Sequence, residues 1–178
     1  KITSRYPEDR IFAEEDGLRS PISEGSVWVI DPIDGTNNFV TQKEDFAVMV
    51  AYFEDGIGQF GLIYDVMRDH LFYGGGEFPV YRNEVELTPF VDQPLENLLI
   101  ASNVGMLEKN DWGMADLGMD SLGIRVYGSA GISFSKILSG GILAYFSYIW
   151  PWDYAAAAIM GEQLGYTVLN LNGDKPNY

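Results

Sequence analysis

The stretch between residues 27 and 36, VWVIDPIDGT, constrains the fold of this chain more than any other. Its first four residues are apolar and predict a buried strand. Asp31 and Asp34 follow, three residues apart, where that strand is expected to end. Two carboxylates this close repel each other unless a cation or a proton lies between them. Gly35 lets the backbone approach a ligand closely, and the residues after it can open a helix whose first N–H groups attract an anion. Together these features are typical of a metal-dependent phosphate site.

The overall composition is that of a folded, acidic protein. The chain has 178 residues, of which 47% are hydrophobic, so it can form one large domain or two small ones. Its 11 basic and 26 acidic side chains leave a formal net charge of −15, which argues against a nucleic-acid surface. The same charge repels a phosphate substrate, but cations held by a carboxylate cluster would reverse the field locally.

The scarcity of cysteine and histidine excludes several kinds of site. The chain has no cysteine, which excludes disulfides, thiolate zinc sites and cysteine nucleophiles. The single histidine, His70, excludes zinc or iron sites with several histidine ligands. His70 follows an expected turn at the start of a strand, and we predict a surface position without a catalytic role.

The sequence contains no segment that is long and apolar enough to span a membrane, because Gly, Pro or Asp interrupts the longest apolar runs. The chain opens at Lys1 in what resembles the end of a helix, and it stops at Tyr178 just after a turn. Both ends therefore resemble cut ends, at which targeting information can be missing. We predict a cytoplasmic protein that does not bind a membrane.

The first half of the chain predicts an antiparallel meander. Apolar runs at 46–53 and 58–64 flank the sequence EDG, which is a hairpin signal. Further strands are expected at 70–73 and 80–87, and a short helix is expected at 36–40. Residues 88–96 contain two prolines and are the best candidate for a linker. We therefore predict an N-terminal half, residues 1–95, built on an antiparallel sheet.

The second half, residues 96–178, alternates between strand and helix patterns, which predicts an α/β layer. The helices are expected at 130–138 and 153–164, and each pattern ends at glycine. The strands are expected at 98–102, 123–127, 143–148 and 167–171. Asp153 stands directly before an alanine-rich run, where it would act as a helix N-cap.

Three further segments could carry chemistry, and each also has an ordinary structural explanation. Glu14 lies at the end of an expected strand, but a solvated acidic turn explains it as well. Asp153 follows two tryptophans and a proline, which make it more rigid than a helix cap requires. Residues 128–130, GSA, offer backbone N–H groups at a helix start, but a tight turn explains them equally.

Taken together, these segments make the chain resemble the inositol monophosphatase family. Residues 28–39, WVIDPIDGTNNF, match the first signature of that family almost throughout. Residues 14–15 (EE), 128–130 (GSA) and 152–156 (WDYAA) match its other segments in the same order. The resemblance implies a Mg²⁺-dependent, lithium-sensitive hydrolase that cleaves phosphate monoesters. It also implies an α/β, or layered α+β, fold: an α/β/α/β/α sandwich.

The resemblance implies a set of oxygen ligands for two or three Mg²⁺ ions. Hard oxygen ligands without histidine or thiolate suit Mg²⁺, in agreement with the residue types alone. Asp31 would bridge two ions, Asp34 and Asp153 would complete a second site, and Glu14 would also hold the attacking water. The implied metal ligands are Glu14, Asp31, the carbonyl of Ile33, Asp34 and Asp153.

The resemblance also assigns the residues that handle the water and the phosphate. The Thr36 hydroxyl would hydrogen-bond the attacking water, and the N–H groups of Gly35 and Thr36 would bind the phosphate. Glu14, Asp31 and Thr36 are thus the implied catalytic residues. The implied substrate-binding residues are Gly35, Thr36, Gly128, Ser129, Ala130 and Asp153.

Departures from the family pattern lie near the expected position of the leaving alcohol. Ser147 stands where the family often carries a glutamate that contacts the inositol ring, and Trp150 and Pro151 reshape the loop before Asp153. The substrate, a small phosphorylated molecule, could therefore be an inositol phosphate, a sugar bisphosphate, a 3′-phosphonucleotide or another alcohol phosphate. A non-catalytic binding protein that keeps the fold is the alternative from another class. Dimers are common among similar proteins, so the chain could form a homodimer. No nucleic-acid partner is expected.

Overall fold

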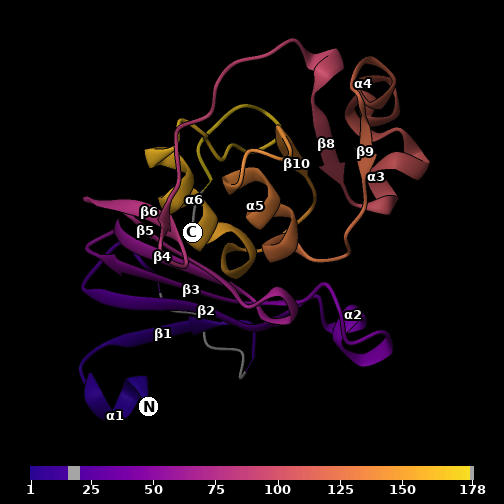
Figure 1. Cartoon of the computed structure of the whole chain (residues 1–178). Coiled ribbons are helices and arrows are strands. Elements are labelled where there is room, and N and C mark those ends of the chain that lie inside the picture. The colour runs from indigo at the N-terminus through magenta and orange to yellow at the C-terminus, as the bar shows by residue number, and fades with distance from the viewer. Residues whose placement is uncertain (16–20, 177–178) are drawn as a thin grey trace.

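The computed structural model describes residues 1–15 and 21–176, and a seven-stranded sheet occupies the first half of the chain (Figure 1). Its strands are β1 (Arg10–Ala13), β2 (Ser26–Asp34), β3 (Ala47–Glu54), β4 (Ile57–Asp65), β5 (His70–Gly75), β6 (Phe78–Arg82) and β7 (Val85–Glu86). They lie in the sheet in chain order. β1 runs parallel to β2, whereas each later neighbour is antiparallel. The predicted meander is confirmed from β2 onward, and the expected strand at 80–87 is divided by a turn.

The second half contains a parallel sheet of three strands in the order β10-β8-β9. These strands are β8 (Leu99–Ser102), β9 (Gly123–Arg125) and β10 (Ala144–Phe146). The helices of the described residues are α1 (Ile2–Arg5), α2 (Thr36–Thr41), α3 (Val104–Lys109), α4 (Met114–Asp120), α5 (Ala130–Leu138) and α6 (Pro151–Gln163), with 3-10 turns η2 (Val66–Arg68), η3 (Leu95–Asn97) and η4 (Asp111–Gly113). The predicted alternation of strands and helices is confirmed from β9 to the end of α6, whereas α3 and α4, between β8 and β9, were not expected.

The layers follow from the burial of α5 and α6, which lie against the large sheet with the small sheet beyond them (Figure 1). The buried core contains side chains of both halves, including Phe53 and Ile63 of the sheet and Ile132 and Met160 of the helices. Burial of such apolar side chains is the main stabilising contribution to a fold of this kind. The division into halves 1–95 and 96–178 stays a prediction.

The backbone of α6 comes unusually close to the large sheet. Gly61 of β4 has no side chain, and a Cβ there would collide with the main-chain carbonyl of Ala156. The alanine run of α6 presents small side chains on the same face, and Ala155, Ala156 and Ala157 are buried. This close contact fixes the height of α6 above the sheet, and therefore the position of its first turn.

One predicted helix boundary and one predicted strand are wrong. The helix expected at 153–164 begins earlier, at Pro151, because proline suits the first helical turn, where its missing N–H has no partner to lose. The strand expected at 167–171 is absent, since these residues lie outside both hydrogen-bonded sheets. Its apolar side chains are partly exposed, with Leu169 exposed by 52%.

No helix among the described residues is long and apolar enough to cross a membrane.

Candidate metal and phosphate site

A bulge in β2 brings Asp31 and Asp34 to the same side of the large sheet. Residues three apart on a regular strand face opposite sides. Here Asp31 is paired with Met49 and Asp34 with Ala47, so β2 advances three residues while β3 advances two. Such an extra residue re-aims the side chain that follows it. As a result both aspartates are buried on the inward face.

Glu14 reaches the same place through the parallel pairing of β1 and β2. Ala13 is paired with Ile30 at the end of β1, and the Glu14 N–H donates to the Ile30 carbonyl at 3.3 Å. The next residue along β2 is Asp31, so the register sets Glu14 beside it. Glu14 is exposed, whereas Asp31 is buried. The predicted neighbourhood of the two residues is therefore present in the structure.

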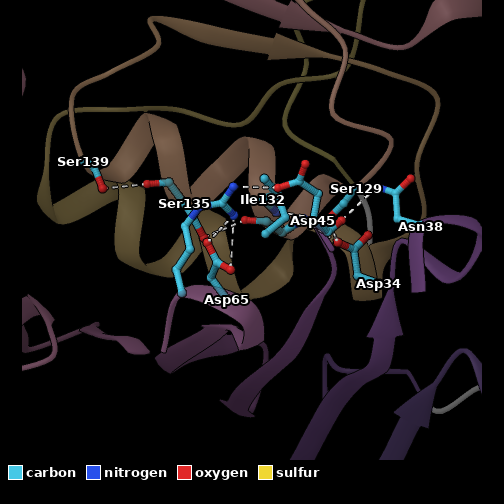
Figure 2. Close-up of polar contacts among 10 residues, drawn as sticks. Asp34, Asn38, Asp45, Asp65, Ser129, Ile132, Ser135 and Ser139 are labelled. Atoms are coloured by element: carbon cyan, nitrogen blue, oxygen red, sulfur yellow. Dashed lines mark hydrogen bonds and ion pairs between the residues drawn. The ribbon is translucent and has the colours of Figure 1, made fainter. Parts of the chain in front are cut away.

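Asp34 is bound by the first turn of α5 (Figure 2). One carboxylate oxygen accepts the Ala130 N–H at 3.0 Å, and the other accepts the Gly131 N–H at 2.8 Å and the Ser129 hydroxyl. Negative charge is favourable at a helix N-terminus, where N–H groups lack partners within the helix. Burial raises the pKa of Asp34, and these three hydrogen bonds oppose that rise.

Asp153 approaches from the first turn of α6, although not as the predicted N-cap. Trp150 occupies the cap position, and Asp153 is the third helical residue. Its carboxylate accepts the Trp150 N–H at 2.7 Å, which is the reciprocal bond of a capping box. The helix thus starts two residues earlier than expected, at Pro151, and this bond fixes one oxygen of the Asp153 carboxylate.

The three aspartates converge, which is the central geometric fact of the site. Asp31, Asp34 and Asp153 each offer a carboxylate oxygen, and these oxygens lie within 4.8 Å of one another. Burial, followed by the charges of Asp34, Glu14 and Asp153, raises the pKa of Asp31 to about 8. Burial also leads the causes that raise the pKa of Asp153 to about 6. Carboxylates crowded in this way hold either protons or cations, and their donor set consists of hard oxygens that suit Mg²⁺.

Gly35 and Thr36 connect this cluster to α2. Gly35 has a φ of 84°, and a Cβ there would lie 2.9 Å from the Ser129 Cβ, so only glycine fits. The Thr36 hydroxyl donates to the Ile33 carbonyl at 3.1 Å. Because the hydroxyl proton points to that carbonyl, the hydroxyl oxygen can accept a hydrogen bond from another group, such as a water molecule.

The segment at 128–130 contacts the aspartate cluster. The Ala130 N–H and the Ser129 hydroxyl both bind Asp34, so they are already used within the protein. Ser129 also caps α5, because its oxygen accepts the Ile132 N–H at 3.1 Å. These two residues therefore position a carboxylate of the cluster, and their assignment as substrate-binding residues stays a prediction. Gly128 is exposed next to them.

Two residues of the site were missed by sequence reasoning. Gly131 donates its N–H to Asp34, and Asn38 donates to the main-chain carbonyls of Asp45 and Tyr127 at 2.8 and 2.7 Å. Asn38 thereby joins α2 to the segment that leads into α5 (Figure 2). Asn38 stands inside the 28–39 signature, and its position there was the available signal. Gly131 carried no signal, because its role is a backbone contact.

Comparison with known proteins assigns the family. A model of the inositol monophosphatase family matches residues 1–178, the whole chain. The chain belongs to the inositol monophosphatase family. The inositol-1-monophosphatase of Bacillus subtilis (strain 168) is 37% identical over 180 residues, a match that covers 98% of this chain and 68% of that protein. The expected family and its phosphatase class are confirmed.

Solved inositol monophosphatase structures confirm the predicted layered fold. Inositol monophosphatase-II from Staphylococcus aureus MSSA476 superposes with a TM-score of 0.92 and 34% identity, covering 99% of this chain and 70% of that one. Structures of SaIMPase-II have been described with 2′AMP and with inositol monophosphate bound. An IMPase/NADP phosphatase complexed with Mg²⁺ and phosphate superposes with a TM-score of 0.90 at 26% identity, covering 99% and 67% of the two chains. The chain thus spans about two thirds of the length of its relatives.

Proposed function

We propose that this chain hydrolyses a small phosphate monoester by means of Mg²⁺ ions bound at the aspartate cluster. The observation that carries the proposal is the convergence of Asp31, Asp34 and Asp153, whose carboxylate oxygens lie within 4.8 Å of one another. Two of these side chains are buried, so a cation is needed for all of them to be ionised together. The Mg²⁺- and phosphate-bound relative supports the choice of metal.

The proposed ligands are the carboxylates of Glu14, Asp31, Asp34 and Asp153 and the carbonyl of Ile33. When bound, the cations supply positive charge that stabilises the attacking and leaving oxygens of an in-line displacement. Hydrogen bonds from the first turn of α5 hold Asp34 in place and favour its ionised form against the effect of burial, and the Trp150 N–H does the same for Asp153. The ligands thus come from β2, α6 and the residue that follows β1, so the site forms only when these elements are packed together.

Thr36 and Glu14 are the residues proposed to orient the attacking water. The Thr36 hydroxyl donates to Ile33, so it can accept one proton of the water in a hydrogen bond. Glu14 is exposed beside Asp31, which leaves its carboxylate accessible to the same water. The N–H groups of Gly35 and Thr36 would then orient the phosphate, and such positioning supplies a large part of the rate acceleration in phosphoryl transfer.

A phosphate-release assay tests this proposal. The protein is freed of metal with a chelator and assayed with inositol 1-phosphate, 2′-AMP, fructose 1,6-bisphosphate and glycerol 2-phosphate, with and without Mg²⁺. We expect release only with Mg²⁺, and inhibition by excess Ca²⁺, because the larger ion tolerates coordination that leaves the reacting atoms misaligned. Full activity in chelator would refute the proposal. Mg²⁺ binding without release from any substrate would favour the non-catalytic alternative.

An aromatic surface beside the cluster favours a leaving group that carries a planar ring. The Trp150 indole is 63% exposed and stacks on Trp152, with ring centroids 5.5 Å apart and ring planes at 12°. Its main-chain N–H binds the Asp153 carboxylate, so Trp150 directly contacts a proposed metal ligand through its backbone. The relative solved with 2′AMP holds a substrate-like molecule with such a ring. We expect Trp150→Ala to lower kcat/KM for 2′-AMP more than for glycerol 2-phosphate, and equal losses would contradict this candidate.

Lithium is proposed to inhibit this chain in the millimolar range. Staphylococcal inositol monophosphatase-1, 26% identical with a TM-score of 0.90, has been solved as an inhibitory complex soaked in LiCl. The Asp34 and Asp153 carboxylates are the proposed site, because a small monovalent cation can occupy it after turnover. Unchanged turnover in lithium at saturating substrate would refute this proposal.

The homodimer and the cytoplasmic location stay predictions, which light scattering and cell fractionation would test.

A further inference from the structure

Arg68 links two acidic side chains at the edge of the candidate site. It is the last residue of η2, the turn between β4 and β5. Its Nη2 lies 2.8 Å from an Asp45 carboxylate oxygen, and its Nη1 lies 3.1 Å from Asp65. Asp65 is buried, with 1% of its surface exposed, whereas Asp45 and Arg68 are partly exposed. One guanidinium therefore joins the end of β4 to the loop that follows α2.

The main chain of Asp45 contacts residues of the candidate site. Its main-chain carbonyl accepts the Asn38 side-chain amide at 2.8 Å, and Asn38 also binds the Tyr127 carbonyl. The same Asp45 carbonyl would lie 3.2 Å from a Cβ at Gly35. It therefore also lies against the phosphate loop, that is, Gly35 and Thr36, whose N–H groups are proposed to bind the phosphate. Figure 2 shows Asn38 and Asp45 beside Asp34 and Ser129. A shift of Asp45 would therefore be transmitted to the start of α2.

The loop that contains Asp45 is in a conformation that must be held in place. Lys43 and Asp45 have φ angles of 58° and 49°, in the left-handed region that residues with a Cβ rarely adopt. Such residues persist where surrounding contacts determine their conformation. The ion pair with Arg68 is such a contact for Asp45, and it anchors the loop to the end of a sheet strand.

We propose that Arg68 is a positioning residue for the phosphate loop. By binding the Asp45 carboxylate, it holds the Asp45 carbonyl against Asn38 and Gly35, and so fixes the start of α2 over the aspartate cluster. The proposal rests on the proposed function, since it assigns Gly35 and Thr36 to the phosphate. Arginine suits this position, because a guanidinium can bind two carboxylates at once and an ammonium group holds two less well.

Two variants separate positioning from folding. Asp45→Asn removes the ion pair but keeps the shape of the side chain, the main-chain carbonyl and the Arg68–Asp65 pair. Arg68→Lys keeps a positive charge beside buried Asp65, which limits the loss of stability. Asp92→Asn is the matched control, because it removes the same charge from an exposed residue outside any helix or strand. The full-length chain is used for all measurements.

The readouts are the melting temperature, kcat and KM, the inhibition constant of inorganic phosphate, and amide hydrogen exchange over residues 35–42. We expect Asp45→Asn and Arg68→Lys to weaken phosphate inhibition and to lower kcat/KM by about 10- to 100-fold, the range for a displaced binding group. Exchange over 35–42 should become faster in both variants, with melting temperatures close to that of Asp92→Asn. The control should match the unaltered protein.

Unchanged phosphate inhibition and unchanged exchange in both variants would overturn the proposal. A fall in rate that follows only the folded fraction would overturn it as well, since that is the behaviour of a purely structural ion pair. If the unaltered protein releases no phosphate with Mg²⁺, the proposed function fails. The exchange measurement would still decide, in that case, whether Arg68 holds the loop.

Discussion

Asp31 occupies a place where a negative charge is unfavourable in the absence of a cation. It is buried on the inward face of β2, and Asp34, Glu14 and Asp153 act on it electrostatically. The proton retained by Asp31, whose pKa is about 8, takes the place that we propose for a metal. The same residue is thus expected to limit the stability of the metal-free protein and to be indispensable for turnover.

We predict that the metal-free protein becomes less stable as the pH rises from about 6 to about 8.5. The pKa values of Asp31 and Asp153 in the folded state are about 8 and about 6, above the ordinary aspartate value of 3.8. The folded state therefore binds more protons than the unfolded state in this range, and the stabilisation is lost as the pH passes these values. Melting temperatures in chelator should fall with pH, less so in Asp31→Asn or in Mg²⁺. A fall of equal size in Asp31→Asn would contradict this assignment.

Gly35→Ala should both strain the loop and displace α5. The φ of 84° costs about 1 to 3 kcal/mol for a residue with a Cβ, and the new methyl would lie 2.9 Å from the Ser129 Cβ. Gly140→Ala is the control, because its φ is 74° and nothing lies within 4 Å of an added Cβ. In urea unfolding, Gly35→Ala should lose more stability than Gly140→Ala, and it alone should lose turnover. Equal losses of stability would show that the close contact at Ser129 is absent.

At the scale of elements, local sequence predicts most of the structure and misses what depends on contacts. The boundaries of α5, residues 130–138, follow from the small residues before it and the glycines after it, and they are confirmed. The sequence predicts Asp153 as an N-cap, because an aspartate before an alanine run suits that position. In the structure the helix begins at Pro151 instead, and Trp150 is the N-cap. The strand expected at 167–171 had the right residues but lies outside both sheets in the described chain.

The contact of α6 with β4 predicts a coupling between packing and metal binding. Gly61→Ala would force α6 away from the sheet, at a cost of about 1 to 3 kcal/mol for overpacking. Because Asp153 lies in the first turn of α6, the Mg²⁺ concentration for half-maximal activity should rise. Gly141→Ala is the control, since its added Cβ would meet only the Lys136 carbonyl, at 3.5 Å. A Gly61 variant with normal stability and normal Mg²⁺ dependence would show that this close contact does not set the helix position.

At the scale of the whole molecule, the site joins segments that are distant in sequence. Ser129 and Asp34 are 95 positions apart, and the hydrogen bond between them could not be predicted from local pattern. The three aspartates could be predicted as a group only because the motifs resembled a known family in their order. The bulge between Asp31 and Asp34 is what sets both carboxylates on one face, and Pro32 within it is a local signal for a bulge, because proline inside a sheet is found at such irregularities.

The net charge of −15 predicts an effect of salt on substrate binding. The overall field repels a phosphate monoester, and salt screens that field, with a Debye length of about 30 Å at 0.01 M and about 8 Å at 0.15 M. At saturating Mg²⁺, we expect KM to fall as KCl rises over this range, while kcat stays constant. Steady-state kinetics with glycerol 2-phosphate would measure this. A KM that rises with salt would show that local positive charge dominates the approach of the substrate.

Asp31 is proposed to hold catalytic metal, and the turnover of Asp31→Asn with saturating Mg²⁺, measured against its folded fraction, tests this. The amide keeps the shape of the side chain and removes one charge from the residue proposed to bridge two cations. We predict a loss of several orders of magnitude in kcat/KM, while the metal-free variant at pH 8 melts at or above the temperature of the unaltered protein, because carboxylate repulsion is relieved. Near-normal turnover of a folded Asp31→Asn would contradict the account and show that the metal site lies elsewhere.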